Sequence, residues 1–530
     1  MSNYLMAIDA GTGSIRAVIF NKEGNQIGCV QKEWKHSEDP RYPGSMDFDC
    51  NTNWRLVCLC IKEVLSQTKI SARQIAAVST TCMREGIVLY GKAGNELWAC
   101  ANVDARAKDE VTQLKKLDPN YKPASGEISL IEKELYLKTG QTFALGALPR
   151  LLWVKNKLPD VYEKTANMTM INDWLIFRLS GVLAVEPSNG STTGLIDLKS
   201  RNWDIDIARR CALRDDIFPE VKECGSISGE VSKKGAQESG LCEGTPLVTG
   251  GGDCQLGTIG VGVAKEGEAV VFGGSFWQYE FNSDSPACSP KCDVRVNCHA
   301  APGLWQYEAL AFNPGLVMRW FRDAFCAEEK RIAAERNIDP YTILDDMALS
   351  VPAGSNGMIC TFSDVMNYIN WKHASPAFIN FSLDPQKFNK AAFYRAVMEN
   401  SCLVTLGHLR LVEEAAGKRP AKIVFAGGAA KSKLWPQILC DVLGIPVEVP
   451  VVKEATALGA AIMAGKGIGL FSGISETAEK LVKIEKTFYP DAKNREVYDK
   501  AFKDWQEVYR QMLKLSDEGV TNFMWRAPGI

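Results

Sequence analysis

Three glycine-rich segments, each beside an acidic or hydroxyl residue, constrain this chain more than any other feature. They read DAGTGSIRAVIF from Asp9, VTGGGDCQLG from Val248 and VFAGGAAKSKLW from Val424. Each follows an apolar run that predicts a strand. Glycine lets the backbone after such a strand curve tightly and bring its N–H groups close to a phosphate chain. Three such segments in one chain predict a nucleotide held between two domains.

Length and charge narrow the possibilities further. The chain has 530 residues, of which 46% are hydrophobic, and this exceeds what one hydrophobic core usually organises. We therefore expect two domains, residues 1–245 and 246–530. The 61 basic and 63 acidic residues give a net charge of -2. The sequence shows no basic stripe of the kind that binds a phosphate backbone, so we expect no nucleic-acid partner.

Hydropathy and cysteine usage favour a cytoplasmic protein. No window approaches the roughly 18 to 20 uninterrupted apolar residues of a membrane span, and no secretory leader pattern is visible. The 17 cysteines are scattered through predicted strands and helices, which fits buried thiols in a reducing compartment. Cys288, Cys292, Cys298 and His299 are residue types that bind zinc, but they contain no C-x-x-C pair, and free thiols in a loop are favoured.

The order of the patterns indicates an α/β fold with a repeated plan. Residues 4–34 predict three strands joined by tight turns. Residues 246–282 predict a strand, the GGGD turn, a short helix and two further strands. Beyond residue 300, apolar residues spaced three and four apart predict long helices with buried faces. A charged helical tail is expected at about 475–516.

Other nucleotide-binding systems fit less well. No stretch matches GxxxxGK[ST], and the cluster GKGIGL near Gly465 follows a predicted helix rather than a strand. What remains is the phosphate-binding hairpin of actin-like and hexokinase-like ATPases, where an acidic residue ending the first strand of each domain faces ATP and its metal. Asp9 and Asp253 take those two positions. The predicted fold is therefore a two-domain actin-like ATPase (ribonuclease H-like) fold with an active-site cleft between the domains.

The ordered motifs resemble one kinase family over essentially the whole chain. They are DAGTGSIRA from Asp9, MREG from Met83, NDWLIFRLSG from Asn172, GGGDCQLG from Gly250, GGS from Gly273, YRAVMEN from Tyr394, FAGGAAKS from Phe425 and KEATALGAA from Lys453. This set resembles the FGGY group of carbohydrate kinases, which includes glycerol kinase, xylulokinase and rhamnulokinase. Ser275 stands where we expect threonine, and Ala429 with Ala430 where we expect glycine and serine.

The resemblance implies an ATP-dependent kinase that uses Mg²⁺ and phosphorylates a small polyhydroxy carbonyl compound. Some members are controlled by proteins of the sugar phosphotransferase system, so a regulatory partner of that kind is a family-level expectation. A pentulose or deoxyhexulose kinase is an alternative. A non-catalytic sugar sensor is another, but such a protein should have lost Asp253 or gained a DNA-binding helix-turn-helix, and this chain shows neither.

Asp253 is the predicted catalytic base. Phosphoryl transfer to an alcohol requires alignment of the acceptor, neutralisation of the phosphate oxygens and removal of one proton. A carboxylate after three glycines approaches the γ-phosphate closely, and it becomes a better base when the cleft closes and water leaves. The alternative is a carboxylate that only caps the following helix.

Both sides of the nucleotide have candidate residues. Asp9, with Asp253, is predicted to hold Mg²⁺, while Arg16 adds positive charge or else projects into solvent. The terminal phosphates are assigned to Gly11, Thr12, Gly13 and Ser14. The second domain is expected to contribute Gly273, Gly274, Ser275, Gly427, Gly428, Ala429 and Ser432. A tight turn between strand and helix would require the same glycines without any ligand.

Arg84 and Glu85 are the main candidates for the acceptor. Family position places this pair at the sugar-binding end, where paired charges hydrogen-bond adjacent oxygens, although the pair is also compatible with an ordinary surface position. The other acceptor-site candidates are Asp104, Asp173, Trp174, Asp253, Gln255 and Trp277. For Asp173 the alternative is a helix N-cap, and for Trp277 it is packing in the core.

Overall fold

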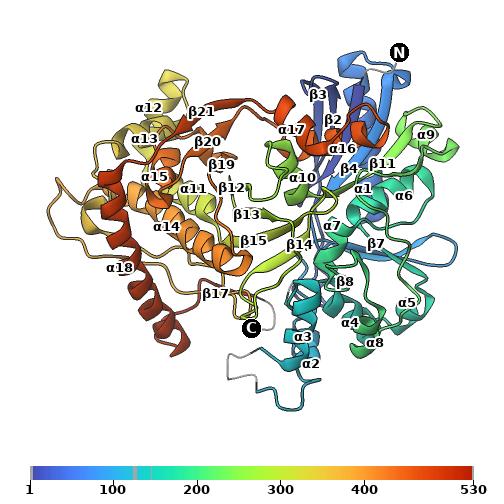
Figure 1. Cartoon of the computed structure of the whole chain (residues 1–530), viewed down its shortest axis with the longest axis horizontal. Helices are drawn as coiled ribbons and strands as arrows, with labels where there is room; N and C mark the ends of the chain where they lie inside the picture. Colours follow the sequence, from blue (N-terminus) through green and yellow to red (C-terminus); the bar gives the residue numbers. More distant parts are fainter. Residues whose placement is uncertain (1–3, 123–127, 145, 528–530) are drawn as a thin grey trace.

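The computed structural model describes residues 4–122, 128–144 and 146–527. It has two lobes, each organised around one large sheet (Figure 1). The first sheet has six strands in the order β10-β11-β4-β1-β2-β3. Their bounds are β1 Tyr4–Ala10, β2 Ser14–Asn21, β3 Gln26–Glu33, β4 Ile75–Cys82, β10 Ile227–Glu230 and β11 Pro246–Gly252.

The second sheet repeats this plan. It has seven strands in the order β14-β15-β13-β12-β19-β20-β21. Their bounds are β12 Ala269–Gly273, β13 Trp277–Ser283, β14 Arg295–Cys298, β15 Trp305–Ala311, β19 Ile423–Ala426, β20 Val447–Pro450 and β21 Ile484–Phe488. In each sheet an antiparallel trio (β1, β2, β3 or β12, β13, β15) continues into two parallel strands (β4, β11 or β19, β20). The two sheets therefore share one plan, but the second copy begins at β12 and not at residue 246 as the sequence predicted.

Strand β11 lies in the first sheet, although the division at residue 245 places it in the second domain. It pairs in parallel with β4, and the strand that corresponds to β1 in the second sheet is β12. Asp9 and Asp253 therefore both belong to the first sheet, and the expectation of one acidic residue in each domain was wrong. The reason is that strand, glycine turn and helix look alike in sequence at both places, whereas strand pairing depends on distant residues.

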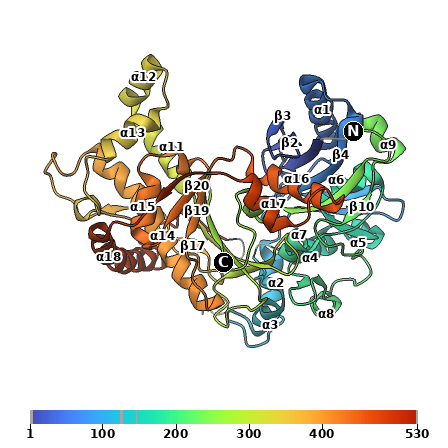
Figure 2. The same ribbon diagram turned by 45° about the horizontal axis from the view of Figure 1, so that its top comes forward.

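The first sheet is buried on both faces. Met6 and Ile8 of β1 share a core with α1 (Cys50–Thr68) and α6 (Ile171–Ser180). Leu5 and Ala7, which alternate with them, pack against α16 (Ala455–Gly467) on the other face. Helix α16 comes late in the sequence yet lies beside the first strands in both views (Figures 1 and 2). The C-terminal part of the chain thus completes the first lobe.

Glycines fix the position of α10 (Asp253–Gly260) against α16. A Cβ on Gly260 would lie 1.8 Å from the carbonyl oxygen of Ala455, and one on Gly459 would lie 2.0 Å from that of Leu256. Only glycine permits two backbones to approach so closely. Because α10 begins at Asp253, this contact also fixes where that carboxylate stands.

The second lobe packs helices against the second sheet. Helices α14 (Lys390–Ala416), α15 (Trp435–Leu443) and α18 (Ala492–Asp517) contribute to its large core. The predicted continuous tail was wrong, because β21 separates α17 (Ile474–Leu481) from α18 and pairs with β20 at the sheet edge. Within the described ranges, no helix has the length and apolar character needed to cross a bilayer.

Smaller elements surround the two sheets. The remaining helices with eight or more residues are α2 Lys108–Lys115, α3 Leu130–Thr139, α4 Ala147–Lys157, α11 Pro314–Phe325, α12 Ala327–Arg336 and α13 Pro340–Ala348. The shorter ones are α5 Pro159–Lys164, α7 Pro187–Gly190, α8 Ile205–Arg210 and α9 Lys233–Ser239. A three-stranded sheet contains β5 Ile87–Tyr90, β6 Glu96–Cys100 and β7 Asn167–Met170. Two-residue strands are β8 Ile196–Asp197, β9 Asn202–Trp203, β16 Ile359–Cys360, β17 Lys372–His373, β18 Phe378–Ile379 and β22 Trp525–Arg526.

Candidate active site

The carboxyl ends of three parallel strands bring the acidic candidates to one edge of the first sheet. Asp9 of β1 is in register with Thr81 of β4, and Thr81 is in register with Gly251 of β11. Asp253 follows β11 directly. Since neighbouring strands lie about 4.8 Å apart, the backbones of β1 and β11 are roughly 9.6 Å apart with β4 between them. The register thus places Asp9 and Asp253 at the same edge of the sheet, with Asp253 two residues beyond the level of Asp9.

Asp9 is a buried carboxylate among more negative than positive groups. Arg16, directly opposite on β2, lies 3.4 Å from Asp9 and 3.5 Å from Glu454. Arg16 therefore faces the site. Burial raises the pKa of Asp9 to about 7, the Arg16 charge opposes this rise, and the charges of Asp253 and Glu454 add to it. A buried carboxylate with this excess of negative neighbours fits a hard divalent cation such as Mg²⁺, which prefers oxygen ligands.

The turn between β1 and β2 is held from one side. The indole N–H of Trp34 donates to the carbonyl oxygen of Gly11 at 3.0 Å, and His36 Nε2 lies 2.7 Å from that of Thr12. The amide of Asn102 donates to Thr12 Oγ1 at 3.0 Å. These contacts fix a short glycine turn next to Asp9, as a phosphate-binding loop requires.

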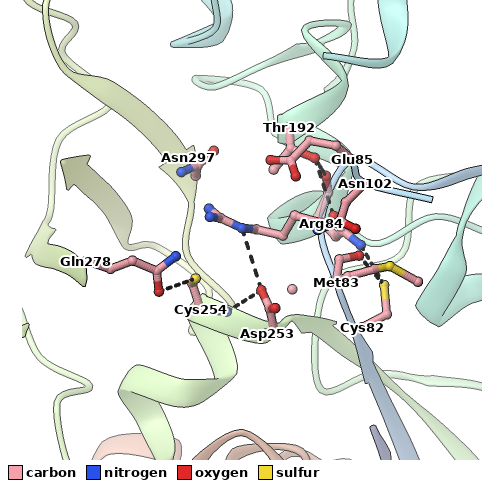
Figure 3. A network of polar contacts seen from close by, with 12 residues as sticks. Cys82, Met83, Arg84, Glu85, Asn102, Thr192, Asp253, Cys254, Gln278 and Asn297 are labelled. Carbon is pink, nitrogen blue, oxygen red and sulfur yellow. Dashed lines mark hydrogen bonds and ion pairs between the residues drawn. The ribbon is translucent and has the colours of Figure 1, made fainter. Parts of the chain in front are cut away.

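Asp253 lies beside Arg84, whose side chain reaches the second lobe (Figure 3). Its Oδ1 is 3.6 Å from Arg84 Nε and accepts the Cys254 backbone N–H at 2.8 Å. The N-cap of α10 is Gly252, so Asp253 is not the cap residue. Its side chain is 38% exposed, which leaves the carboxylate accessible to a ligand. Desolvation in the cleft raises the pKa of Asp253, and the Arg84 charge opposes that rise.

Arg84 and Glu85 are not an ordinary surface pair, because residues of the second lobe hold both. Arg84 is 6% exposed and donates two hydrogen bonds to Glu308 of β15. Glu85 accepts a hydrogen bond from Arg295 of β14 at 2.6 Å. Glu85 also has a φ of 63°, a left-handed conformation that is unusual outside glycine, and Arg150 holds its carbonyl oxygen. Both lobes therefore shape this corner of the cleft.

A cavity of about 610 Å³ opens in the second lobe. Six predicted nucleotide residues line it, namely Gly273, Gly274, Ser275, Gly428, Ala429 and Ser432. Its tightest backbone approach is at Gly315, where a Cβ would lie 2.1 Å from the carbonyl oxygen of Gly274. Gly427 has a φ of 97°, and a Cβ there would lie 2.7 Å from Gly273 O. These two glycines therefore shape the cavity, and Gly427 does so from outside its lining.

Two family models match the chain. The N-terminal domain of the FGGY family of carbohydrate kinases matches residues 4–260, and the C-terminal domain matches residues 286–468. The chain belongs to the FGGY family of carbohydrate kinases. This FGGY kinase is therefore an ATP-dependent phosphotransferase with an alcohol group as acceptor.

Curated relatives and solved structures agree with this. The chain is 51% identical over 528 residues to proteins named autoinducer-2 kinase from Yersinia enterocolitica and Yersinia pestis, covering 100% of this chain and 98% of theirs. A xylulose kinase structure from Rhodospirillum rubrum matches with a TM-score of 0.83 at 22% identity, covering 97% of this chain and 99% of that one. Plasmodium falciparum glycerol kinase with ADP gives 0.81 at 19%, covering 96% and 98%. The predicted two-domain fold is confirmed.

Asp104 and Trp174, two predicted acceptor residues of this FGGY kinase, face the interior of the first lobe. The Asp104 carboxylate accepts the Met46 backbone N–H at 2.7 Å and pairs with Arg106 at 2.7 Å. Trp174 is fully buried, and its indole donates to Glu96 at 3.1 Å. Both side chains are committed to internal contacts, so the structure does not bring them to Asp253.

Asp173 and Trp277 also lie away from the open cleft. Asp173 is buried in the first turn of α6, where Met170 is the N-cap, and its Oδ1 accepts from Asn172. Burial raises the pKa of Asp173 well above its usual value. Trp277 is fully buried beneath the glycines of the nucleotide cavity and donates to Thr405 at 2.8 Å. Trp277 therefore packs in the core, as its alternative predicted. Asp173 is not the N-cap of α6, so the alternative given for Asp173 is wrong.

Gln255 is the remaining acceptor candidate. It is fully buried one turn into α10, and neither atom of its amide has a hydrogen-bond partner. A Cβ on Gly252 would meet Gln255 Oε1 at 2.4 Å and Arg84 Cγ at 3.1 Å. Gln255 and Arg84 thus both lie next to the Gly252 backbone, and the Gln255 side chain is buried.

His299 of the cysteine-rich segment is held by internal hydrogen bonds. His299 uses both ring nitrogens within the protein, with Nε2 2.8 Å from Thr258 Oγ1 and Nδ1 accepting from the Ala301 N–H. All seventeen cysteines are free thiols. Cys254, Glu280 and Glu308 do place donor atoms within 4.8 Å of one another. However, the two guanidinium groups that already contact Glu308 would repel a cation.

Sequence reasoning missed several residues of the site. Asn102 supports the phosphate turn, Arg150 holds Glu85, and Arg295 and Glu308 contact the Arg84–Glu85 pair. Tyr341 lines the nucleotide cavity. None of these lies in a glycine motif. The one available signal was a single charged residue in each of two short strands, Arg295 in β14 and Glu308 in β15, which is unusual for a sheet core.

Proposed function

We propose that this FGGY kinase phosphorylates the terminal hydroxyl of autoinducer-2, the signalling molecule derived from 4,5-dihydroxy-2,3-pentanedione. The carrying observation is 51% identity along the whole chain to relatives named autoinducer-2 kinase, against 19 to 22% to xylulose and glycerol kinases of the same fold. We place the reaction in the cytoplasm, where ATP is available and free thiols persist.

ATP is proposed to span the two lobes. Its base and ribose occupy the 610 Å³ cavity, beside Gly428, Ala429 and Ser432. Its terminal phosphates reach the turn Gly11 to Ser14, which Trp34 holds in place. Backbone N–H groups of such a turn bind phosphate oxygens without the cost of reorganising solvent.

Asp9 and Asp253 would hold Mg²⁺ at the edge of the first sheet. The excess of carboxylates around Arg16 fits this ion, as argued above. When bound, the metal neutralises the developing charge on the phosphate oxygens. The protein itself supplies the alignment of the acceptor and the removal of its proton.

Asp253 is the proposed base for the acceptor hydroxyl. Its carboxylate is accessible, and the raised pKa makes it a stronger base than an ordinary aspartate. Arg84, 3.6 Å away, keeps it charged and positions it. Arg84 and Glu85 then hydrogen-bond the acceptor oxygens next to the reacting hydroxyl, which places that hydroxyl within reach of Asp253.

The test is kcat/KM for ATP-dependent ADP release with 4,5-dihydroxy-2,3-pentanedione, compared with glycerol, xylulose, ribulose, rhamnulose and fuculose. We expect a preference of at least tenfold for the pentanedione. A preference for a ketose would overturn the proposed acceptor and retain the site. Absence of turnover with every compound would contradict a kinase and favour a sensor.

A further inference from the structure

Two charged residues of the second lobe lie where the acceptor corner of the first lobe ends. Arg295 of β14 and Glu308 of β15 are directly opposite each other in the sheet, so their side chains share one face. Arg295 is 1% exposed and Glu308 is fully buried. In Figure 3 the Arg84 side chain extends towards the strand that carries Asn297, the neighbour of these residues.

The contacts form a crossed network between the lobes. Arg84 donates through both terminal nitrogens to Glu308, and Arg295 contacts Glu308 at 3.3 Å as well as Glu85 at 2.6 Å. Burial alone would raise the pKa of Glu308, but the charges of Arg84 and Arg295 hold it below its usual value. Two guanidinium groups therefore balance two carboxylates in a nearly dry space, where loss of one leaves its partner uncompensated.

Further side chains hold the second-lobe half of the network. The amide of Asn297 donates to Glu308 at 3.2 Å, and Gln141 accepts from Arg295 Nε at 2.8 Å. Tyr368 donates to the same Gln141 oxygen at 3.1 Å. Arg295 and Glu308 are thus fixed in orientation before any ligand arrives.

The Arg84–Glu85 pair keeps hydrogen-bonding groups that a ligand can contact. Each terminal nitrogen of Arg84 carries two N–H groups, and Glu308 uses one on each, which leaves one on each. Arg295 occupies Oε1 of Glu85, which leaves Oε2 as an acceptor. Without Glu308, the Arg84 guanidinium would turn towards Asp253, which is already 3.6 Å away, and would fill the space of the acceptor hydroxyl.

We propose that Glu308 and Arg295 are positioning residues for the acceptor, each fixing one member of the Arg84–Glu85 pair from across the domain boundary. The inference rests on the proposed function in one respect, that Arg84 and Glu85 contact the acceptor. It adds that the acceptor site is complete only when the second lobe supplies its two buried charges.

The experiment compares Glu308→Gln with a matched variant, Glu399→Gln. Glu399 is also a buried carboxylate of the second lobe, 4% exposed and paired with Arg395 at 2.8 Å, but it lies in α14 among Ser355 and Tyr498. We expect Glu308→Gln to raise KM for the acceptor at least tenfold and to leave KM for ATP within about twofold. Glu399→Gln should lower the melting temperature comparably and leave both KM values within about twofold.

Conservative variants separate positioning from stability. Glu308→Asp keeps the charge, so its acceptor KM should lie between those of wild type and Glu308→Gln. Arg295→Lys keeps the charge but loses the planar fork that contacts two carboxylates, so acceptor KM should still rise severalfold. An unchanged acceptor KM in Glu308→Gln, or an equal rise of acceptor KM in Glu399→Gln, would overturn the proposal.

Failure of the proposed function is distinguishable from failure of this inference. If wild type prefers a ketose, KM is measured on that ketose and the same outcomes apply. If wild type turns over no acceptor, the network is tested by thermal unfolding instead. The variants are Arg84→Gln, Glu308→Gln and the double variant. Coupled residues should give a double variant less destabilised than the sum of the single ones. Additive losses would contradict the network.

Discussion

The carboxyl edges of the two sheets share a strand order and differ in chemistry. The first sheet ends β1 and β11 with Asp9 and Asp253. In the second sheet, Gly273 ends β12, the counterpart of β1, and Gly427 follows β19, the counterpart of β4, so glycines without side chains stand at these two positions. The same backbone plan thus provides charge at one edge and room for a ligand at the other. The repeat therefore fixes the backbone plan, and the residues at the strand ends decide which chemistry each edge offers.

Energetic strain is distributed differently at the two edges. The first edge crowds carboxylates, so the pKa values of Asp9 and Asp253 are raised. The second edge instead crowds backbones, with prospective Cβ contacts of 2.1 Å at Gly315 and 2.7 Å at Gly427. Charge at the first edge should respond to pH and cations, whereas packing at the second edge should respond to side-chain volume.

The largest expected effect is at Asp253. Asp253→Asn keeps the shape of the side chain and removes its ability to accept a proton, so kcat should fall by about 10²- to 10⁴-fold. The rate of ADP release with the preferred acceptor measures kcat, and circular dichroism checks that the variant is folded. A variant that keeps more than about a tenth of wild-type kcat would contradict the proposed base.

The second prediction concerns the crowded backbone at Gly315, beside the edge of the second sheet. Gly315→Ala places a Cβ 2.1 Å from Gly274 O, so we expect a loss of about 1 to 3 kcal/mol in the free energy of unfolding and a raised KM for ATP. Gly274→Ala is the stability control, because its Cβ would come no closer than 3.5 Å to Phe276 O. Equal stability losses in urea unfolding would show that backbone crowding does not distinguish these positions.

Sequence reasoning located most residues that a local motif defines. The turn after β1, Asp253 and the Arg84–Glu85 pair each come shortly after the end of a strand, and the structure brings Asp253 next to Arg84. Sequence reasoning failed where the position of a strand depends on pairing with distant residues. Strand β11 joins the first sheet through β4 and α16, and no residue of its own sequence reports that choice.

The missed residues have the same physical cause. Arg295 and Glu308 look like misplaced charges within buried strands until Arg84 and Glu85 are brought next to them. Conversely, Trp277 lies next to a glycine motif in sequence, yet it points into the core and donates to Thr405. Adjacency along the chain therefore predicted the backbone of the site better than it predicted the directions of its side chains.

A stability effect that depends on pH should separate the two edges. In the absence of metal and nucleotide, the folded-state pKa of Asp9 is about 7, above its unfolded value near 3.8. The folded state therefore binds the proton more tightly, so stability falls as pH rises from about 4 to 7. Asp9→Asn should remove this loss, on the order of 2 to 4 kcal/mol, and be more stable than wild type at pH 8 but not at pH 4. Melting temperatures are measured in the presence of a chelator. A difference between Asp9→Asn and wild type that stays constant from pH 4 to 8 would contradict the prediction.

The smallest expected effect concerns Trp277, which the sequence predicted in the acceptor site and the structure places in the core. Trp277 packs 5.2 Å from Trp435 beneath the nucleotide glycines, with Gly273 close enough that a Cβ there would lie 3.0 Å from the indole. Trp277→Phe keeps an aromatic ring and removes the hydrogen bond to Thr405, so we expect a stability loss of about 1 kcal/mol and a slightly raised KM for ATP. The ratio of kcat/KM between acceptors should not change, because the side chain supports the second edge and does not face the acceptor. A tenfold shift in acceptor preference would instead place Trp277 in the acceptor pocket.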